Sequence, residues 1–183
     1  MDNGESSYRR FLDGDESAFE EIVLTYREGL VFFIGRIVGD TMTAEDIAID
    51  VFADVLLHRH RYHFKTSLKT YLYMLGRSRA IDHVRRKKLI KTVPLSDAEN
   101  EISEEISPED TVLKDETKRL VHNALRCLPE DMRLAVHLVY FEGLSYEETA
   151  KIMKKTKKQI DNLVYRAKNT LRSVIGKDGE YSL

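Results

Sequence analysis

The residues best suited to chemistry lie near the end of the chain, where eight Lys or Arg side chains stand against one Asp between Lys151 and Arg172. Cationic side chains neutralise phosphates, and an amide such as that of Asn162 can read the edge of a base. This combination is typical of a surface that binds duplex DNA. The candidate contacts are Lys155, Lys157, Lys158, Asp161, Asn162, Tyr165 and Arg166.

Two capping signals predict the elements that carry these residues. Ser145 with Glu148, and Thr156 with Gln159, have the capping-box spacing, so we expect two helix starts eleven residues apart. The second helix has one apolar stripe, formed by Ile160, Leu163, Val164, Ala167 and Leu171. A short helix, a turn and a basic helix describe a helix-turn-helix whose second helix enters a major groove. The alternative is a helical hairpin with a solvated charged face, and the turn has Lys154 where glycine is common.

A second cationic stretch, residues 58–66, interleaves His, Arg and Lys with aromatic residues. Bases of single-stranded nucleic acid stack on aromatic rings while cations follow the phosphates, so this stretch is typical of a single-strand-binding surface. The candidates are Tyr62, His63, Phe64 and Lys65. A metal site fits less well, because no carboxylate or cysteine completes the histidines and the neighbouring cations would repel a divalent ion. A loop with a packed aromatic residue is the structural alternative.

Acidic residues mark one helix in the N-terminal half of the chain. Asp46, Asp50 and Asp54 recur at intervals of four, which places them on one helix face. Like charges at this spacing repel each other, and a basic partner surface would remove that cost. The face is therefore a candidate protein-binding surface. A solvated acidic face near a helix N-terminus is the alternative.

The other helices follow from caps and apolar periodicity. The expected boundaries are a start at Ser17 with an end at Gly39, a cap at Thr43, a start at Ser67 with an end near Lys88, and a start at Pro129 with an end at Gly143. The helix that begins at Ser67 ends in a cationic tip, which includes Arg85 and Arg86 and can hold a phosphate backbone. In the same helix Asp82 falls on the apolar line. We expect either a rotated helix or a buried or partly buried pair of Asp82 with Arg79 or Arg86.

Periodicity and composition together predict the fold class and the domain organisation. The chain is predicted to be all-α, because its apolar periodicity is helical. Residues 93–111 contain prolines, serines and acidic charges, which favour a flexible acidic linker between two small helical domains, 1–92 and 112–183. The C-terminal domain would be the helix-turn-helix. Cys127 is the only cysteine, which excludes an intramolecular disulfide, and we expect it to be buried in a protein of a reducing compartment. No apolar stretch suits a signal peptide or membrane insertion, which predicts a cytoplasmic protein.

From about Ser17 to Arg172 the chain resembles an extracytoplasmic-function (ECF) sigma factor, a small bacterial transcription initiation factor of the sigma-70 family. The likeness to the family's region 2 is carried by Ala44-Glu45-Asp46-Ile47, Val51-Phe52, Tyr71-Leu72 and the segment from Arg77 to Arg86. The likeness to region 4 is carried by Leu128-Pro129, Gly143-Leu144-Ser145-Tyr146-Glu147-Glu148 and Arg166-Ala167-Lys168. The two motifs occur in this order with no third domain between them. Tyr71 stands where relatives commonly have Trp, and Ser78 where they commonly have Asn, which can read an adenine edge.

The resemblance implies partners for each surface. Glu45, Asp46, Asp50 and Asp54 would dock on the clamp helices of the largest subunit of core RNA polymerase, and the C-terminal domain would meet the flap of the second subunit. Residues 58–66, with Arg77, Ser78, Arg85 and Arg86, would read and open the −10 element of a promoter and trap unpaired bases of the non-template strand. The helix-turn-helix would bind the duplex −35 element. An anti-sigma factor is a further implied partner, and neither a cofactor nor a catalytic activity is implied.

Two other classes of function are consistent with parts of the sequence. A stand-alone helix-turn-helix repressor or activator with a helical sensing domain would bind duplex DNA without polymerase, and it would leave residues 58–66 without a role. A helical metal-dependent enzyme would use His58, His60, His63 and His83. Metal analysis of the purified protein would test that alternative.

Overall fold

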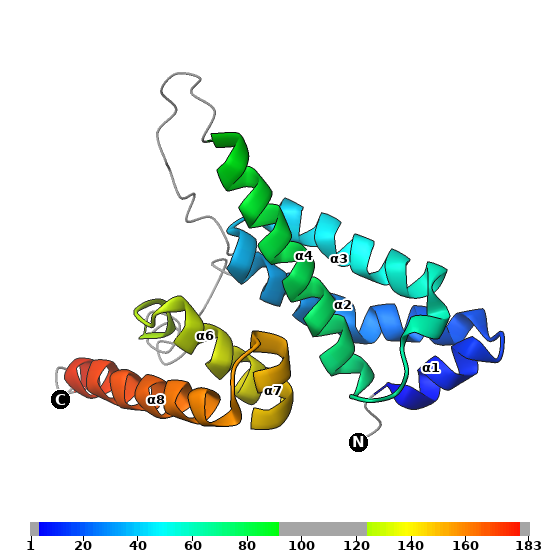
Figure 1. The fold of residues 1–183 in the computed structure, drawn as a ribbon. Coiled ribbons are helices and arrows are strands. Elements are labelled where there is room, and N and C mark those ends of the chain that lie inside the picture. Colours follow the sequence, from blue (N-terminus) through cyan, green and yellow to red (C-terminus); the bar gives the residue numbers. More distant parts are fainter. Residues whose placement is uncertain (1–3, 92–123, 180–183) are drawn as a thin grey trace. The chain divides into compact units, whose positions relative to one another are not determined.

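The computed structural model describes residues 4–91 and 124–179, and within these ranges every regular element is a helix (Figure 1). The chain divides into two compact units, Met1–Ile106 and Ser107–Leu183. The all-helical class predicted from the sequence is confirmed. The predicted linker, residues 93–111, lies outside the described residues. No described helix combines the length and the apolar composition that crossing a membrane requires.

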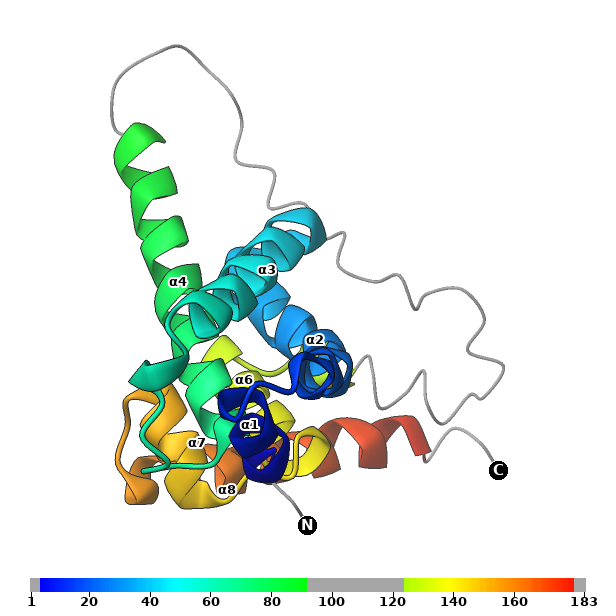
Figure 2. The same cartoon turned by 90° about the vertical axis from the view of Figure 1, so that its right-hand side faces the viewer.

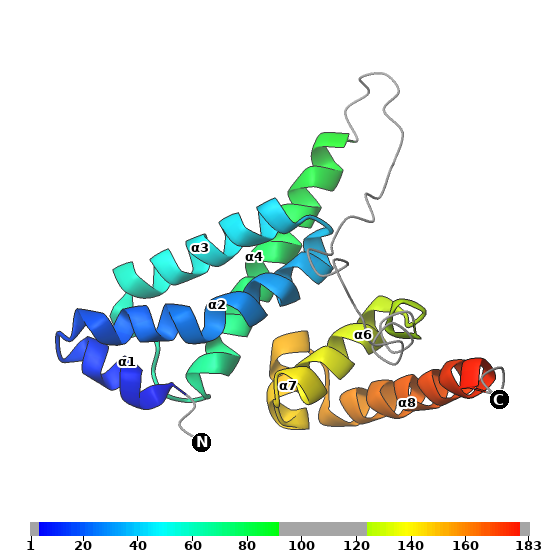
Figure 3. The same cartoon turned by 180° about the vertical axis from the view of Figure 1, so that it is seen from behind.

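The N-terminal unit is built around its second helix, α2. Its elements are α1 (Glu5–Leu12), α2 (Glu16–Val38), α3 (Thr41–Leu57), the short 3-10 turn η1 (Arg59–Arg61) and α4 (Leu68–Lys91). Helix α2 packs against α1, α3 and α4. Helices α2 and α3 run side by side and α4 crosses them (Figures 1 and 3), while Figure 2 shows α1 beside α2. Helix α1 was not expected from the sequence.

A glycine sets the distance between α2 and α4. A Cβ atom at Gly76 would lie 2.9 Å from Leu30 Cδ1 and 3.1 Å from Ile34 Cδ1, so any other residue would force these side chains of α2 to shift. Nearby, the buried rings of Phe33 and Tyr73 pack with their centroids 5.1 Å apart. This close crossing fixes the direction in which α4 leaves the core.

Aspartates cap two helices for which the sequence predicted hydroxyl caps. The cap of α2 is Asp15, whose carboxylate accepts a hydrogen bond from Ser17 N at 3.1 Å. The cap of α3 is Asp40, whose carboxylate accepts from Thr43 N at 2.8 Å. Hydrogen bonds from Ser17 and Thr43 lower the pKa of these two carboxyl groups. The predicted starts at Ser17 and Thr43 were therefore wrong, because an ionised carboxylate caps as well as a hydroxyl and also interacts favourably with the helix dipole. Gly39 ends α2 at φ 79°, as predicted.

The C-terminal unit contains the predicted helix pair. Its described elements are α6 (Glu130–Val136), the π-helical turn η2 (His137–Phe141), α7 (Tyr146–Met153) and α8 (Lys157–Gly179). A core of Leu128, Met132, Val136 and Ala167 joins α8 to α6. Pro129 is the cap of α6 and not its first residue, and Gly143, at φ 67°, follows the end of η2. The prediction that Cys127 is buried was wrong, since its side chain is exposed.

Candidate nucleic-acid and protein interfaces

Reciprocal caps build the turn between α7 and α8. Glu148 N donates to Ser145 Oγ at 3.2 Å while Ser145 N donates to Glu148 Oε2 at 2.9 Å. Thr156 and Gln159 repeat the arrangement, with Thr156 N donating to Gln159 Oε1 at 2.7 Å and Gln159 N donating to Thr156 Oγ1 at 3.2 Å. Both predicted capping boxes are confirmed. Lys154 takes the left-handed conformation, at φ 53°, that the turn requires and that glycine would adopt without strain.

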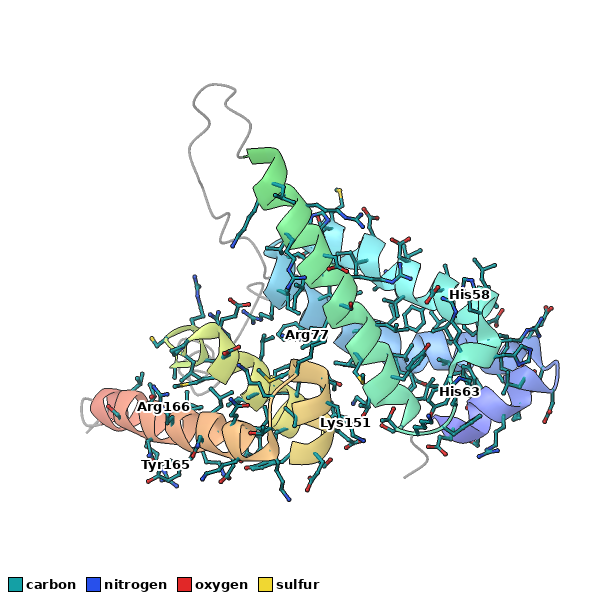
Figure 4. The ribbon with its side chains drawn as sticks, in the orientation of Figure 1. His58, His63, Arg77, Lys151, Tyr165 and Arg166 are labelled. Atoms are coloured by element: carbon teal, nitrogen blue, oxygen red, sulfur yellow. The ribbon has the colours of Figure 1, made fainter. Side chains whose placement is uncertain are left out.

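Helix α8 presents its polar residues to solvent. The inner stripe is buried at Ile160, Val164 and Ala167 and partly buried at Leu163 and Leu171. The exposed residues are Lys157, Lys158, Asp161, Asn162, Tyr165, Arg166, Lys168 and Arg172. Tyr165, on the outer side of α8 (Figure 4), is 65% exposed. A large aromatic ring and several cations on one exposed helix face suit contact with a polyanion better than packing within the unit.

The lysines of this surface differ in their partners. Lys155 Nζ lies 2.9 Å from a carboxylate oxygen of Asp131, and Lys157 is paired with Glu147. The hydrogen bond that Lys157 donates to the Glu147 carboxylate raises the pKa of Lys157. Lys158 and Arg166, in contrast, have no ion pair among the described residues. Exposed ion pairs contribute little to stability, so Lys157 can exchange Glu147 for a phosphate at small cost.

The stretch of residues 58–66 is a loop with one buried aromatic residue. Tyr62 is only 4% exposed, and its hydroxyl donates to the Thr66 carbonyl oxygen at 2.6 Å. Its ring centroid lies 4.9 Å from that of Tyr8 and 5.1 Å from that of Tyr71. Burial raises the pKa of Tyr62. The ring predicted to stack on a base is therefore packed inside the protein, as the structural alternative for this stretch expected.

The remaining residues of the loop face outward. His63 and Lys65 are exposed and Phe64 is half-buried. Figure 4 shows His58 and His63 at the same end of the N-terminal unit. Within the described residues, no group of three or more His, Cys, Asp and Glu side chains is arranged to hold a metal ion.

The three aspartates of α3 have two different environments. Asp46 and Asp50 are exposed, whereas the side chain of Asp54 is 17% exposed and is surrounded by basic side chains. One of its carboxylate oxygens lies 2.9 Å from His58 Nδ1 and 3.4 Å from Arg61 Nη1, and the other lies 3.5 Å from Arg79 Nη2. Asp54 therefore connects α3 to the loop and to α4. Asp46 and Asp50, in contrast, have no ion pair among the described residues.

Sequence reasoning missed the apolar part of this helix face. Met42, Ile49 and Leu56 are 74%, 58% and 46% exposed, and Leu57 is 76% exposed. Met42, Ile49 and Leu56 are spaced at intervals of seven, which was the available signal for a second apolar stripe. Glu45, which flanks this surface, lies 3.4 Å from Arg27. Exposed apolar side chains next to free carboxylates are typical of a surface that contacts another protein.

Helix α4 settles the expected pairing of Asp82. The Asp82 side chain is 53% exposed and lies 3.8 Å from Arg85, while Arg79 pairs with Asp54. Of the two alternatives, the pair of Asp82 with Arg79 or Arg86 is not found among the described residues, because the Asp82 side chain reaches solvent. Ser67 begins the helix as predicted, since its hydroxyl accepts from Thr70 N at 3.2 Å. Ser78, Arg85 and Arg86 are exposed, and Arg77 is partly buried midway along α4 (Figure 4).

The geometry defines an all-helical protein with a helix-turn-helix and a separate helical unit with an exposed acidic and apolar helix face. The family model described as sigma-70 region 2 matches residues 22–90, and the model described as sigma-70, region 4 matches residues 118–171. The RNA polymerase sigma-H factor of Pseudomonas aeruginosa is 31% identical over 166 residues, which cover 86% of each chain. The ECF RNA polymerase sigma-E factor of Escherichia coli is 27% identical over 172 residues, which cover 88% of each chain.

The chain therefore belongs to the sigma-70 family of RNA polymerase sigma factors, and its relatives place it among those of the ECF type. Sigma factors of this family direct transcription initiation. Two solved structures share the fold. The sigma factor RpoE of Bartonella quintana, in complex with the anti-sigma factor NepR, has a TM-score of 0.64 at 22% identity and covers 86% of this chain and 96% of its own. CnrH, in complex with the cytosolic domain of CnrY, has a TM-score of 0.63 at 15% identity, with 97% and 99% covered.

Proposed function

We propose that this chain binds core RNA polymerase through α3 and directs it to promoters with −35 and −10 elements, without catalysing a reaction itself. The observation that carries the proposal is the outer face of α3, where Asp46 and Asp50 stand beside Met42 and Ile49. A basic and partly apolar partner helix would neutralise the carboxylates and cover the apolar side chains. The clamp helices of the polymerase's largest subunit are the proposed partner.

The N-terminal unit would read and open the −10 element. In residues 1–92, the loop with His63, Phe64 and Lys65 leads into the start of α4, and α4 would supply Arg77, Ser78, Arg85 and Arg86. Each stacking step of duplex DNA is worth about 1.4 kcal/mol, so opening a few base pairs costs several kcal/mol. Capture of unpaired non-template bases by stacking, together with cationic contacts to their phosphates, would offset much of that cost. Tyr62 would support the loop from inside.

The C-terminal unit would bind the −35 element as a duplex. Helix α8 would lie in the major groove, where Asn162 and Lys158 reach base edges and Arg166 contacts a phosphate. Residues 112–183 would also meet the flap of the second polymerase subunit. The acidic residues 93–111 would pass toward the polymerase's nucleic-acid channels. RpoE was solved with a bound anti-sigma factor, and we propose that an anti-sigma factor likewise covers these surfaces in a cytoplasmic complex.

Transcription with sigma-free bacterial core polymerase tests the proposal. The protein is added to core enzyme and genomic fragments, and specific transcripts are expected. The double substitution Asp46→Lys and Asp50→Lys should abolish them without unfolding the protein, since both side chains are exposed. Absence of transcripts, together with tight binding of duplex DNA by the protein alone, would instead support a stand-alone repressor or activator.

A further inference from the structure

The loop that precedes α4 contains a strained residue. Phe64 has φ 56°, a left-handed conformation that bulky side chains rarely adopt. Such a conformation persists only where the surrounding structure holds it, and it often marks a functional site. The contacts of Phe64 therefore indicate what the loop is built to present.

Helix α1 supplies most of the structure that holds this loop. The buried ring of Tyr8 meets the Phe64 ring edge to face at 6.0 Å, and its hydroxyl donates to the Arg59 carbonyl oxygen at 2.7 Å. Tyr62 packs against Phe64 from within the loop at 4.7 Å. Gly4, at the start of α1, approaches Leu68 so closely that a Cβ atom there would lie 3.1 Å from Leu68 Cδ2. Residues far apart in sequence thus form one rigid platform.

Arg9 lies on the outside of that platform. Its guanidinium carbon is 4.3 Å from the centre of the Phe64 ring, and its side chain is exposed. No described carboxylate lies within ion-pairing distance of Arg9. The adjacent Arg10 is different, because its guanidinium contacts Asp15 at 2.6 Å and Glu21 at 2.9 Å. Arg9 is therefore a planar cation held against an aromatic ring and not neutralised by the protein.

We propose that Arg9, stacked on Phe64, is a binding site for one unpaired nucleobase of the melted strand. A base can stack on a guanidinium plane as it does on an aromatic ring, and Phe64 orients that plane before the base arrives. His63 and Lys65, exposed on either side of Phe64 in sequence, hold the adjoining phosphates. This assignment rests on the proposed capture of a single strand by the loop, and it adds α1 to that surface.

Binding of two single strands by the full-length protein tests the site. One is a fluorescein-labelled, random-sequence DNA strand of about 12 nucleotides, and the other is an abasic strand of the same length and charge. The wild-type protein should prefer the strand with bases. Arg9→Lys keeps the charge but removes the planar group, so it should reduce this preference at least about fivefold and leave affinity for the abasic strand unchanged. Phe64→Leu should reduce the preference in the same way.

The matched control is Arg10→Lys, the same substitution at the next residue. The Arg10 guanidinium is already paired with Asp15 and Glu21, so this variant should keep the preference for the strand with bases. Equal preference in Arg9→Lys and wild type would overturn the assignment. Equal loss of affinity for both strands would also overturn it, since Arg9 would then be a phosphate contact only. If the wild type itself showed no preference for bases, the proposed strand capture would fail together with the Arg9 site.

Discussion

The two proposed DNA-binding surfaces are positioned in different ways. The turn of the helix-turn-helix is set by caps that lie between Ser145 and Gln159, so the groups that fix the start of α8 are its neighbours in sequence, although α8 also packs on α6. The loop of residues 58–66 is set by Tyr8, 51 residues before Arg59, and by Arg79 on α4. The turn of the first surface therefore depends on local hydrogen bonds, and the loop of the second depends on long-range packing. Damage to the first should stay local, and damage to the second should spread through the unit.

Removal of Tyr8 should give the largest effect on stability. Tyr8→Ala deletes a fully buried ring that packs against Phe11, Tyr62 and Phe64, so we expect a loss of about 3 to 5 kcal/mol in the free energy of unfolding. Tyr8→Phe removes only the hydrogen bond to Arg59 and should cost about 1 kcal/mol. Urea unfolding followed by circular dichroism measures both. An Ala variant as stable as the Phe variant would show that α1 does not support the loop.

Charge reversal on α3 should give the largest effect on partner binding. Asp46→Lys with Asp50→Lys places two cations where a basic partner is proposed, and we expect a loss of affinity for core polymerase of about 100-fold. Asp54→Asn is the matched control, because Asp54 already pairs with His58, Arg61 and Arg79. Titration of labelled protein with core polymerase measures the affinities. A large loss in Asp54→Asn with normal binding by the reversed pair would place the contact elsewhere on α3.

The same contrast explains how much of the molecule was predictable. The caps of α7 and α8 and the buried stripe of α8 were predicted residue by residue, because the interacting groups are three or four positions apart. The burial of Tyr62 was predicted only as the alternative for its stretch, since deciding it requires knowing that α1 lies over the loop. The cationic surroundings of Asp54 also come from tertiary packing, so spacing alone grouped it with Asp46 and Asp50. The exposure of Met42, Ile49 and Leu56 was not predicted, because other apolar residues of α3 face the core and the two sets were not separated.

Substitutions on α8 should affect DNA binding and leave stability unchanged. Asn162→Ala and Lys158→Ala should each weaken binding to an upstream promoter element by about 1 to 3 kcal/mol where a base is read. Both side chains are exposed, so the unfolding midpoint should not move. Fluorescence anisotropy with a cognate duplex and a scrambled duplex measures the effect. An equal loss on both duplexes would make these residues phosphate contacts without a role in sequence reading.

The smallest expected effect on stability comes from substitutions at the two non-glycine residues that have positive φ in the described structure, one in each unit. Lys154 at φ 53° is exposed and has no ion pair among the described residues, so Lys154→Gly should relieve strain and stabilise the C-terminal unit by about 0.5 to 1 kcal/mol. Phe64→Gly relieves a similar strain but deletes the contacts with Tyr8, Tyr62 and Arg9, so it should destabilise the N-terminal unit. Urea midpoints of the two variants compare these effects directly. If both variants were stabilised, the contacts of the Phe64 ring would contribute less to the free energy of unfolding than the strain of its backbone costs. The conformation of Phe64 would then be kept for binding alone.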